Sequence, residues 1–213
     1  MLFKILGKIR ARKRLQELIR IIYFIKYRIY PKIYRVPSII SRDCIGGVLY
    51  NRMGQVFTSP TINLYMNNED FIAFCLNLKD YLNNELKECF TDLNYPVGKI
   101  QTKTGSIHIC FMHYQSFEEA KASWDRRKAR IDYDNIRVIL NAEGNVPDSV
   151  VDNFKKIPYK KILLSSNLKE DDCIKNMKCY REGYNGSIVE YTNKRFPVKR
   201  YIDEVNWLNF LFR

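Results

Sequence analysis

From residue 36 onward, short apolar segments typical of strands alternate with amphipathic segments typical of helices. We expect strands over residues 36–41, 61–65, 106–113, 136–140 and 161–164, and helices over residues 48–50, 69–86, 116–130, 147–155 and 200–212. This order predicts an open α/β sheet with helices on both faces. In such sheets ligands bind beyond the carboxyl ends of the strands, which indicates where site residues should lie.

The strongest strand signal runs from Ser106 to His113. Its residues are apolar on both faces, which predicts a central position in a covered sheet. Ser116 and Glu119 follow with the spacing of a capping box, so we expect a helix to begin there. Asn68 is expected to cap the helix over residues 69–86 in a similar way.

The first 35 residues form a basic arm that differs from the rest of the chain. Eleven Lys/Arg against one acid give the arm a net charge of +10, whereas the remaining 178 residues carry only +3. Apolar residues at intervals of three and four line one face of a predicted helix: Ala11, Leu15, Leu18, Ile22, Ile25 and Ile29. We expect this helix to end before Pro31, because proline lacks a backbone N–H. Residues 36–213 are expected to form a single α/β domain.

Three roles for residues 1–35 are open. The helix packs on the body with its charges in solvent, lies on an anionic membrane surface, or binds nucleic acid through phosphate contacts. The broad apolar face favours the first two over nucleic acid. The longest apolar run, residues 21–25, is too short to span a bilayer, and no signal-peptide cleavage site follows it. We therefore expect a cytoplasmic protein, peripheral at the inner face of the membrane if the arm binds lipid.

The cysteines and histidines do not form a metal-binding pattern. Six cysteines are present without a Cys-x-x-Cys pair, and the chain has two histidines, so we assign no metal ligands. Cys75 and Cys110 lie within apolar patterns and are expected to be core thiols. In the absence of an export signal, we expect the cysteines to be reduced.

The loop after the first expected strand is one candidate site. Its sequence is RDCIGG, residues 42–47. Paired glycines let a backbone approach a ligand closely, and a following helix offers N–H groups to an anion. Taken alone, the glycines favour a tight turn with positive φ. We assign Asp43, Cys44, Gly46 and Gly47 as candidate ligand-binding residues.

His113, at the end of the expected strand over residues 106–113, is the candidate catalytic residue. An imidazole there is placed to act as a general base or acid near neutral pH. The alternative is a histidine that is merely hydrogen-bonded at a strand end. Cys44 is also a candidate nucleophile, but no sequence motif pairs it with His113.

A basic cluster and an acidic triplet lie further along the chain. The cluster around Arg126 and Arg127 is either a solvated face that complements the helix dipole or a site for phosphate. The triplet DYD, residues 132–134, has the D-x-D spacing of metal-dependent sugar-nucleotide transferases, although acids before a strand are common. We assign Trp124, Arg126, Arg127, Asp134 and Asn135 as candidate ligand-binding residues.

Several segments occur together in a combination that is fairly specific: ISRDCIGGVLY (40–50), SPT (59–61), YPVG (95–98), HY (113–114), WDRR (124–127) and YDN (133–135). From about residue 36 to its end, the chain resembles a bacterial family of unknown biochemical function whose members are often labelled exopolysaccharide or capsular polysaccharide biosynthesis proteins. The resemblance implies a three-layer α/β/α sandwich with a mostly parallel or mixed central sheet, and it supplies no catalytic residue. The family commonly has Asn in place of Asp43 and an aromatic in place of Ile45, which weakens an essential acid role for Asp43.

These observations together predict a transferase that moves a sugar or an acyl group in surface polysaccharide synthesis. His113 would act as base, while Gly46, Gly47, Arg126 and Arg127 would hold donor phosphates. The alternatives are a non-catalytic assembly or scaffold protein of a polysaccharide system and a nucleic-acid-binding module, so catalysis itself stays open. Expected partners are a nucleotide-sugar or other phosphate-bearing donor and, through residues 1–35, an anionic membrane; the sequence identifies no cofactor.

Overall fold

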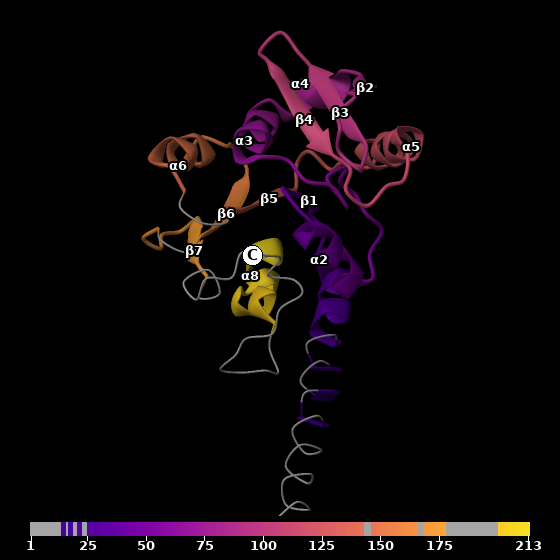
Figure 1. The fold of residues 1–213 in the computed structure, drawn as a ribbon. Helices are drawn as coiled ribbons and strands as arrows, with labels where there is room; N and C mark the ends of the chain where they lie inside the picture. Colours follow the sequence, from indigo (N-terminus) through magenta and orange to yellow (C-terminus); the bar gives the residue numbers. More distant parts are fainter. Residues whose placement is uncertain are drawn as a thin grey trace, which may run out of the picture.

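A parallel four-stranded sheet forms the centre of the computed structural model, which describes residues 14–15, 17–18, 21–22, 25–142, 146–165, 168–177 and 200–213. The strand order is β1-β5-β6-β7 (Figure 1). The strands are β1 (Ser38–Ser41), β5 (Ile136–Asn141), β6 (Lys160–Ser165) and β7 (Ile174–Asn176). The register pairs Ile40 with Val138 and Leu140 with Leu163.

Helices cover both faces of this sheet. Successive side chains of a strand point to opposite faces, so Ile40 and Val138 enter one hydrophobic core and Ile39 and Ile139 the other. The first core contains residues of α3 (Asn68–Leu76), α4 (Leu78–Asn83), α5 (Phe117–Lys128) and α6 (Asp148–Lys155). The second contains residues of α2 (Ile45–Met53), the 3-10 helix η1 (Tyr201–Glu204) and α8 (Trp207–Phe212). Figure 1 shows these two layers above and below the sheet, which confirms the α/β/α sandwich.

A second sheet of three antiparallel strands lies on the side of α3 and α5 (Figure 1). Its strands are β2 (Leu86–Glu88), β3 (Val97–Gln101) and β4 (Ser106–Cys110). The prediction of a central, covered strand over residues 106–113 is therefore wrong. Strand β4 is at an edge, and Ile107 and Ile109 are buried while His108 is exposed, as in a sheet with one solvated face. Residues 111–113 lie beyond the strand, in a turn.

Two predicted helices are each interrupted. The helix expected over residues 69–86 is α3 followed by α4, with a break at Asn77, whose φ of −123° departs from helical geometry. Its cap is Asn67 rather than Asn68, because the Asn67 side chain accepts a hydrogen bond from Asp70 N at 2.6 Å. The closing helix expected over residues 200–212 is η1 and then α8, and the break lets Trp207 Nε1 donate to Ile202 O at 2.6 Å. Helix α5 begins as predicted, with Ser116 as its cap.

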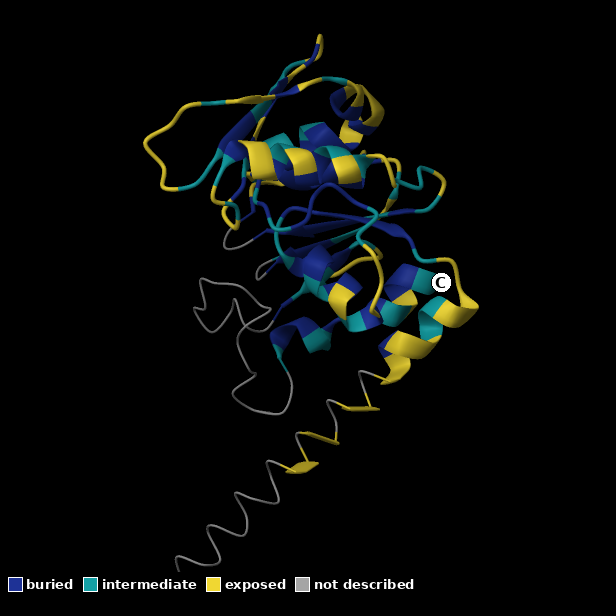
Figure 2. Ribbon diagram, turned by 90° about the vertical axis from the view of Figure 1, so that its right-hand side faces the viewer, coloured by how far each residue is buried: buried dark blue, intermediate teal, exposed yellow. Residues whose placement is uncertain are grey.

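The described residues of the arm are helical up to Ile33, so the helix passes Pro31 instead of ending before it. Proline removes one backbone hydrogen bond, but Tyr34 N still donates to Tyr30 O at 2.9 Å. The rings of Tyr30 and Tyr34 both pack against Phe212 of α8, and these contacts stabilise the last turn. Ala11 of the predicted apolar face lies outside the described residues. Figure 2 shows the described part of the arm leaving the body as an exposed helix. None of the described helices has both the length and the apolar character needed to cross a bilayer.

Candidate active site at the start of helix α2

The loop between β1 and α2 is fixed by its own side chains. Ser41 Oγ donates a hydrogen bond to Asp43 O at 2.7 Å and accepts one from Gly46 N at 3.1 Å. A β-carbon on Gly46 would lie 2.6 Å from the same Ser41 Oγ, so the close approach requires glycine. Gly46 and Gly47 lie in the first turn of α2 without positive φ, which overturns the expected tight turn. The arrangement places Cys44 at the N-cap position of the helix.

Asp43 binds this loop to the neighbouring strand of the sheet. Its Oδ1 accepts from Ile45 N at 3.0 Å, and its Oδ2 accepts from Asn141 Nδ2 at 2.7 Å. Asn141 is the last residue of β5, so the contact joins the carboxyl ends of two parallel strands. The N–H groups of Ile45 and Gly46 are both occupied by side chains of the loop. Asp43 and Gly46 therefore build the loop, and the backbone of Gly46 does not offer the N–H group that was expected to bind phosphate.

Cys44 and His113 form a thiol–imidazole pair. Cys44 Sγ lies 3.2 Å from His113 Nε2, although 69 residues separate them in the chain. Cys44 is half-buried and His113 is exposed, so a reactant can reach the pair from solvent. His113 can accept the thiol proton, and a thiolate at a helix N-terminus interacts favourably with the helix dipole. This is the geometry of a nucleophile beside its base.

A backbone contact between the two halves of the molecule brings this pair together. Tyr65 and Cys110 exchange both of their backbone N–H···O hydrogen bonds, each 2.8 Å long. Met66 N also donates to Arg42 O at 3.2 Å. The segment around Tyr65 therefore joins the end of β1 to the end of β4, three residues before His113. The sequence nominates Cys44 and His113 separately, and this bridge brings them together.

Three other described cysteines differ from Cys44 in their surroundings. Burial raises the pKa of the Cys75 thiol well above its usual value. Burial also raises the pKa values of Cys110 and Cys173. These three thiols keep their protons at neutral pH, whereas Cys44 has an adjacent imidazole that can take its proton.

The predicted ligand residues of α5 have structural contacts. Trp124 is buried in the core against Phe74 and Phe111, so it is closed to a ligand. Arg127 is also buried, and its Nη1 donates to Ile62 O at 3.2 Å and to the hydroxyl of Tyr114 at 2.6 Å. Because Tyr114 follows His113 in the chain, Arg127 braces the turn that carries the imidazole. Arg126 Nη2 donates to Ser123 Oγ within the helix.

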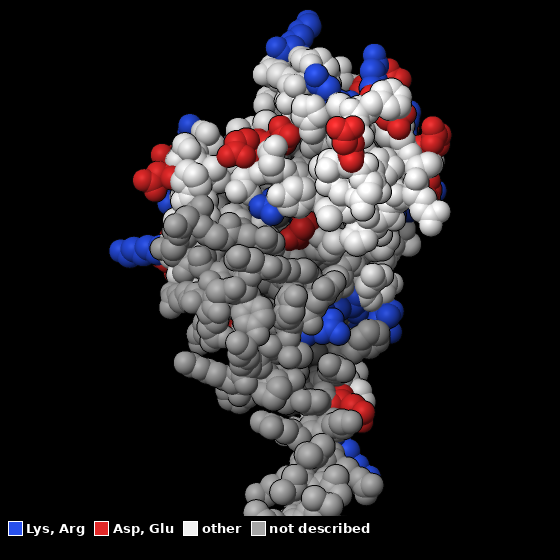
Figure 3. All heavy atoms as spheres, in the orientation of Figure 1, with Lys and Arg blue, Asp and Glu red and all other residues white. Residues whose placement is uncertain are grey.

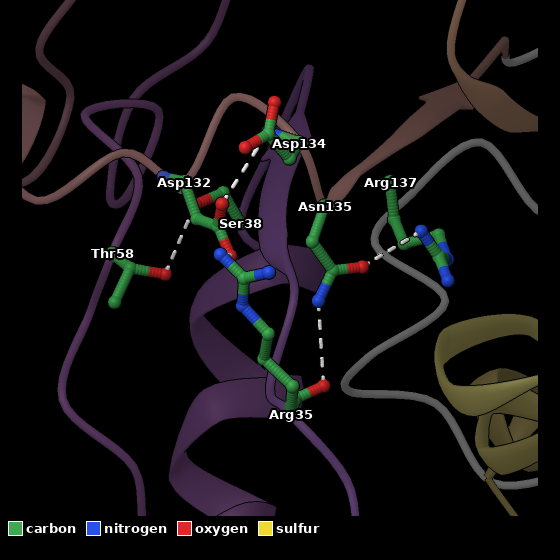
Figure 4. Close-up of polar contacts among 7 residues, drawn as sticks. All are labelled: Arg35, Ser38, Thr58, Asp132, Asp134, Asn135 and Arg137. Atoms are coloured by element: carbon green, nitrogen blue, oxygen red, sulfur yellow. Dashed lines mark hydrogen bonds and ion pairs between the residues drawn. The ribbon is translucent and has the colours of Figure 1, made fainter.

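The D-x-D triplet lies at the opposite end of the parallel strands, before β5 begins, and Figure 4 shows its polar contacts. Asp132 Oδ2 is 2.6 Å from Arg35 Nη2, and Asp134 N donates to Asp132 Oδ1. Asn135 Nδ2 donates to Arg35 O at 3.4 Å. Strands β1 and β5 both begin at this end of the sheet, whereas Cys44 follows the carboxyl end of β1. Asp134 and Asn135 therefore do not share a site with Cys44. Among the described residues, no group of three or more His, Cys, Asp or Glu side chains is arranged to hold a metal ion.

A family model described as "Domain of unknown function (DUF1919)" matches residues 20–211. The chain belongs to this family. It is also similar to an "Uncharacterized protein" of Haemophilus influenzae strain Rd, with 29% identity over 180 residues that cover 81% of this chain and 84% of the relative. The DUF1919 match includes Cys44, His113 and the part of the arm from residue 20. Since neither description carries an activity, the function of this DUF1919 chain has to be argued from its site.

Proposed function

We propose that this protein is an acyltransferase that works through a covalent intermediate on Cys44. The observation that carries this proposal is the 3.2 Å contact between Cys44 Sγ and His113 Nε2. Thiolates activated by a neighbouring imidazole form thioesters with acyl donors. Covalent intermediates on a sugar's anomeric carbon, as in retaining glycosidases, form on a carboxylate instead. The pair thus favours acyl transfer over sugar transfer.

The proposed reaction has two halves. His113 takes the thiol proton, and the Cys44 sulfur attacks the acyl carbonyl carbon of the donor and forms a C–S bond. The bond from that carbon to the donor's leaving group breaks, and the leaving group departs with the proton from His113. A hydroxyl of the acceptor then gives its proton to His113 and attacks the thioester carbon. The C–S bond breaks, and Cys44 leaves as a thiolate that the imidazolium can reprotonate.

We place this reaction in the cytoplasm, at the inner face of the membrane, in the synthesis of a surface polysaccharide. The resemblance described above supports the pathway, since such polysaccharides are built on lipid carriers at that surface. The arm supports the location because it presents two different stripes. Tyr27 is buried on the body, and Tyr30 and Tyr34 pack on Phe212, so one stripe is docked.

The second stripe of the arm is open to solvent. Its residues are 45–56% exposed: Leu15, Leu18, Ile22, Ile25 and Ile29. On a helix of about 3.6 residues per turn, this stripe and the tyrosine stripe lie roughly a third of the circumference apart. The arm can therefore pack on the body and contact lipid at the same time.

The charge of the arm supports an anionic bilayer as the partner of the open stripe. Arg14, Lys26 and Lys32 flank it, and residues 1–35 carry +10 in total. Each Lys or Arg near an anionic surface contributes about 1 kcal/mol, and the interface accepts the apolar side chains. A second copy of the chain would bring two arms of +10 together. On the face in Figure 3, acidic and basic side chains are mixed over the upper part of the body, which does not suit a nucleic-acid backbone.

The test of the chemistry is acyl transfer from a panel of acyl-coenzyme A donors, followed as the release of free coenzyme A thiol. The reaction should require both Cys44 and His113, so Cys44→Ser and His113→Ala should each abolish release above the background. A Cys89→Ser variant is the matched control, because Cys89 is also half-buried but has no place in the pair. If no donor reacts, or if all variants behave alike, the scaffold role becomes the better account.

A further inference from the structure

Arg42 is a buried arginine that has no carboxylate within ion-pair distance among the described residues. Only 4% of the residue is exposed. Its Nη1 donates to Asn68 Oδ1 at 2.5 Å, and its guanidinium carbon lies 4.7 Å from the centre of the Tyr65 ring. Its Nε is enclosed and makes no hydrogen bond to any described group. A guanidinium is always charged in proteins, and a buried charge without a counter-charge is strongly unfavourable.

Arg52 also lies over an aromatic ring and has its counter-charge present, although 18% of its side chain is exposed. Its guanidinium carbon lies 5.5 Å from the centre of the Tyr27 ring, and its Nη1 is 2.7 Å from Asp203 Oδ1. Arg42 has the ring of Tyr65 beside it but no described carboxylate within ion-pair distance. The Nε and Nη2 edge of Arg42, opposite the atom bound by Asn68, is the edge that takes a carboxylate or phosphate in two parallel hydrogen bonds. The comparison indicates that an anion from outside the described chain completes this environment.

Arg42 lies at the carboxyl ends of the parallel strands, as does the thiol–imidazole pair. It precedes Cys44 by two residues, and its backbone is bonded to Met66, next to the Tyr65–Cys110 bridge that positions His113. We propose that Arg42 binds an oxyanion of the substrate, either a phosphate or a carboxylate. Its place in catalysis rests on the acyl transfer proposed above, whereas anion binding itself does not. Because Nε is enclosed in this structure, the proposal requires the surrounding side chains to move when the anion binds.

The direct test measures the thermal unfolding of the Cys44→Ser protein, which cannot form a thioester. The probes are inorganic phosphate, pyrophosphate, acetate and succinate, each compared with chloride at equal ionic strength. An anion at 100 times its dissociation constant should raise Tm by roughly 5–10 °C. The anion that raises Tm most identifies the chemical group, phosphate or carboxylate, that Arg42 binds. No shift with any of the four would overturn the proposal.

Two substitutions assign the shift to Arg42. Arg42→Met should remove the anion effect and leave the Tm without anion equal or higher, because an uncompensated charge is gone. Arg52→Met, the matched control, should lower Tm, because Asp203 loses its partner, and should keep the anion effect. Arg42 would be only structural if the anions raised the Tm of Arg42→Met as much as they raise that of the parent. The same conclusion would hold if Arg42→Met also had a lower Tm without anion.

A third variant keeps the proposal testable if Arg42→Met fails to fold. Asn68→Asp places a carboxylate where the amide oxygen now accepts from Arg42 Nη1. This internal acid should raise Tm without anion and abolish the response to phosphate and carboxylates. An unchanged anion shift in Asn68→Asp would contradict the proposal. If the anion effect follows these expectations while Cys44 forms no thioester, the Arg42 site stands and the transferase proposal fails.

Discussion

Cys44 Sγ and His113 Nε2 lie 3.2 Å apart, although one belongs to the loop after β1 and the other to the turn after β4. A strand of the parallel sheet and a strand of the antiparallel sheet thus each supply one member of the pair. The contact gives a half-buried thiol a proton acceptor at the start of a helix, and both features favour the thiolate. The chemical consequences can be measured one at a time.

Cys44 should be the fastest thiol to react with iodoacetamide at pH 7. The imidazole and the helix N-terminus favour its thiolate, whereas raised pKa values keep Cys75 and Cys110 protonated. Peptide mapping after timed alkylation measures each rate. His113→Ala should slow alkylation of Cys44 by about 10-fold or more and leave the other rates unchanged. Equal rates at Cys44 with and without the imidazole would contradict the pairing.

Gly46→Ala should destabilise the fold by about 1–3 kcal/mol, because the new methyl group would overlap Ser41 Oγ. Urea unfolding followed by circular dichroism measures the change. Gly47→Ala is the control: its β-carbon would lie 3.3 Å from Ile62 Cγ2, which is tight but tolerable, and alanine favours the helix. The account fails here if Gly47→Ala costs as much stability as Gly46→Ala.

Asp171 should make stability depend on pH in acid. The Lys155 ammonium, 2.9 Å away, and the Cys173 N–H lower the pKa of Asp171 from 3.8 to about 2. A depressed carboxyl pKa means that this stabilisation is present above the ordinary value of 3.8 and is lost as pH falls from there towards 2. The difference in unfolding free energy between the parent and Asp171→Asn should therefore shrink over this interval. Because the pair is exposed, the difference should be small even at pH 7, and a constant difference across the interval would be inconsistent with the ion pair.

The full chain should bind vesicles that contain anionic lipid and not vesicles of neutral lipid alone. Replacing Ile22, Ile25 and Ile29 together by Ser should weaken co-sedimentation by at least ~10-fold, because three open apolar side chains are removed. Val56→Ser and Leu93→Ser are controls, since these residues are also exposed and apolar but lie on the body. Light scattering of the same variants tests the alternative that the stripe binds a second copy of the chain. A dimer that the triple substitution dissociates would mean that the stripe binds a second copy.

Strands β1, β5 and β6 of the parallel sheet could be predicted from local signals, whereas the three-residue β7 was not among the expected strands. Strands β5 and β6 are short apolar runs, and Ser116 marks the start of α5. In the antiparallel half, strands β2 and β3 give weaker signals, because β2 has three residues and β3 contains Gly98. Its register depends on partners across a hairpin rather than on a pattern within one segment. The apolar run through β4 was consequently placed in the wrong sheet.

The candidate site shows the same division between local and long-range information. Cys44 and His113 each occupy positions that a sequence can nominate, because Cys44 follows one expected strand and His113 ends another. Their contact depends on the backbone bridge between Tyr65 and Cys110, which no local pattern encodes. Arg42 precedes the nominated loop residues, but its role can be inferred only from its burial and from the lack of a described carboxylate within ion-pair distance.

The most direct test of the central claim is to trap the acyl group on the enzyme. The full chain is incubated with acetyl-coenzyme A and longer acyl-coenzyme A donors, quenched in acid, and mapped by mass spectrometry. We predict an acyl adduct on Cys44 that is absent from Cys44→Ser, forms at least ~10-fold more slowly in His113→Ala, and is unaffected by Cys89→Ser. An adduct spread over several cysteines, or one that forms equally fast without the imidazole, would contradict a nucleophilic role for the Cys44–His113 pair.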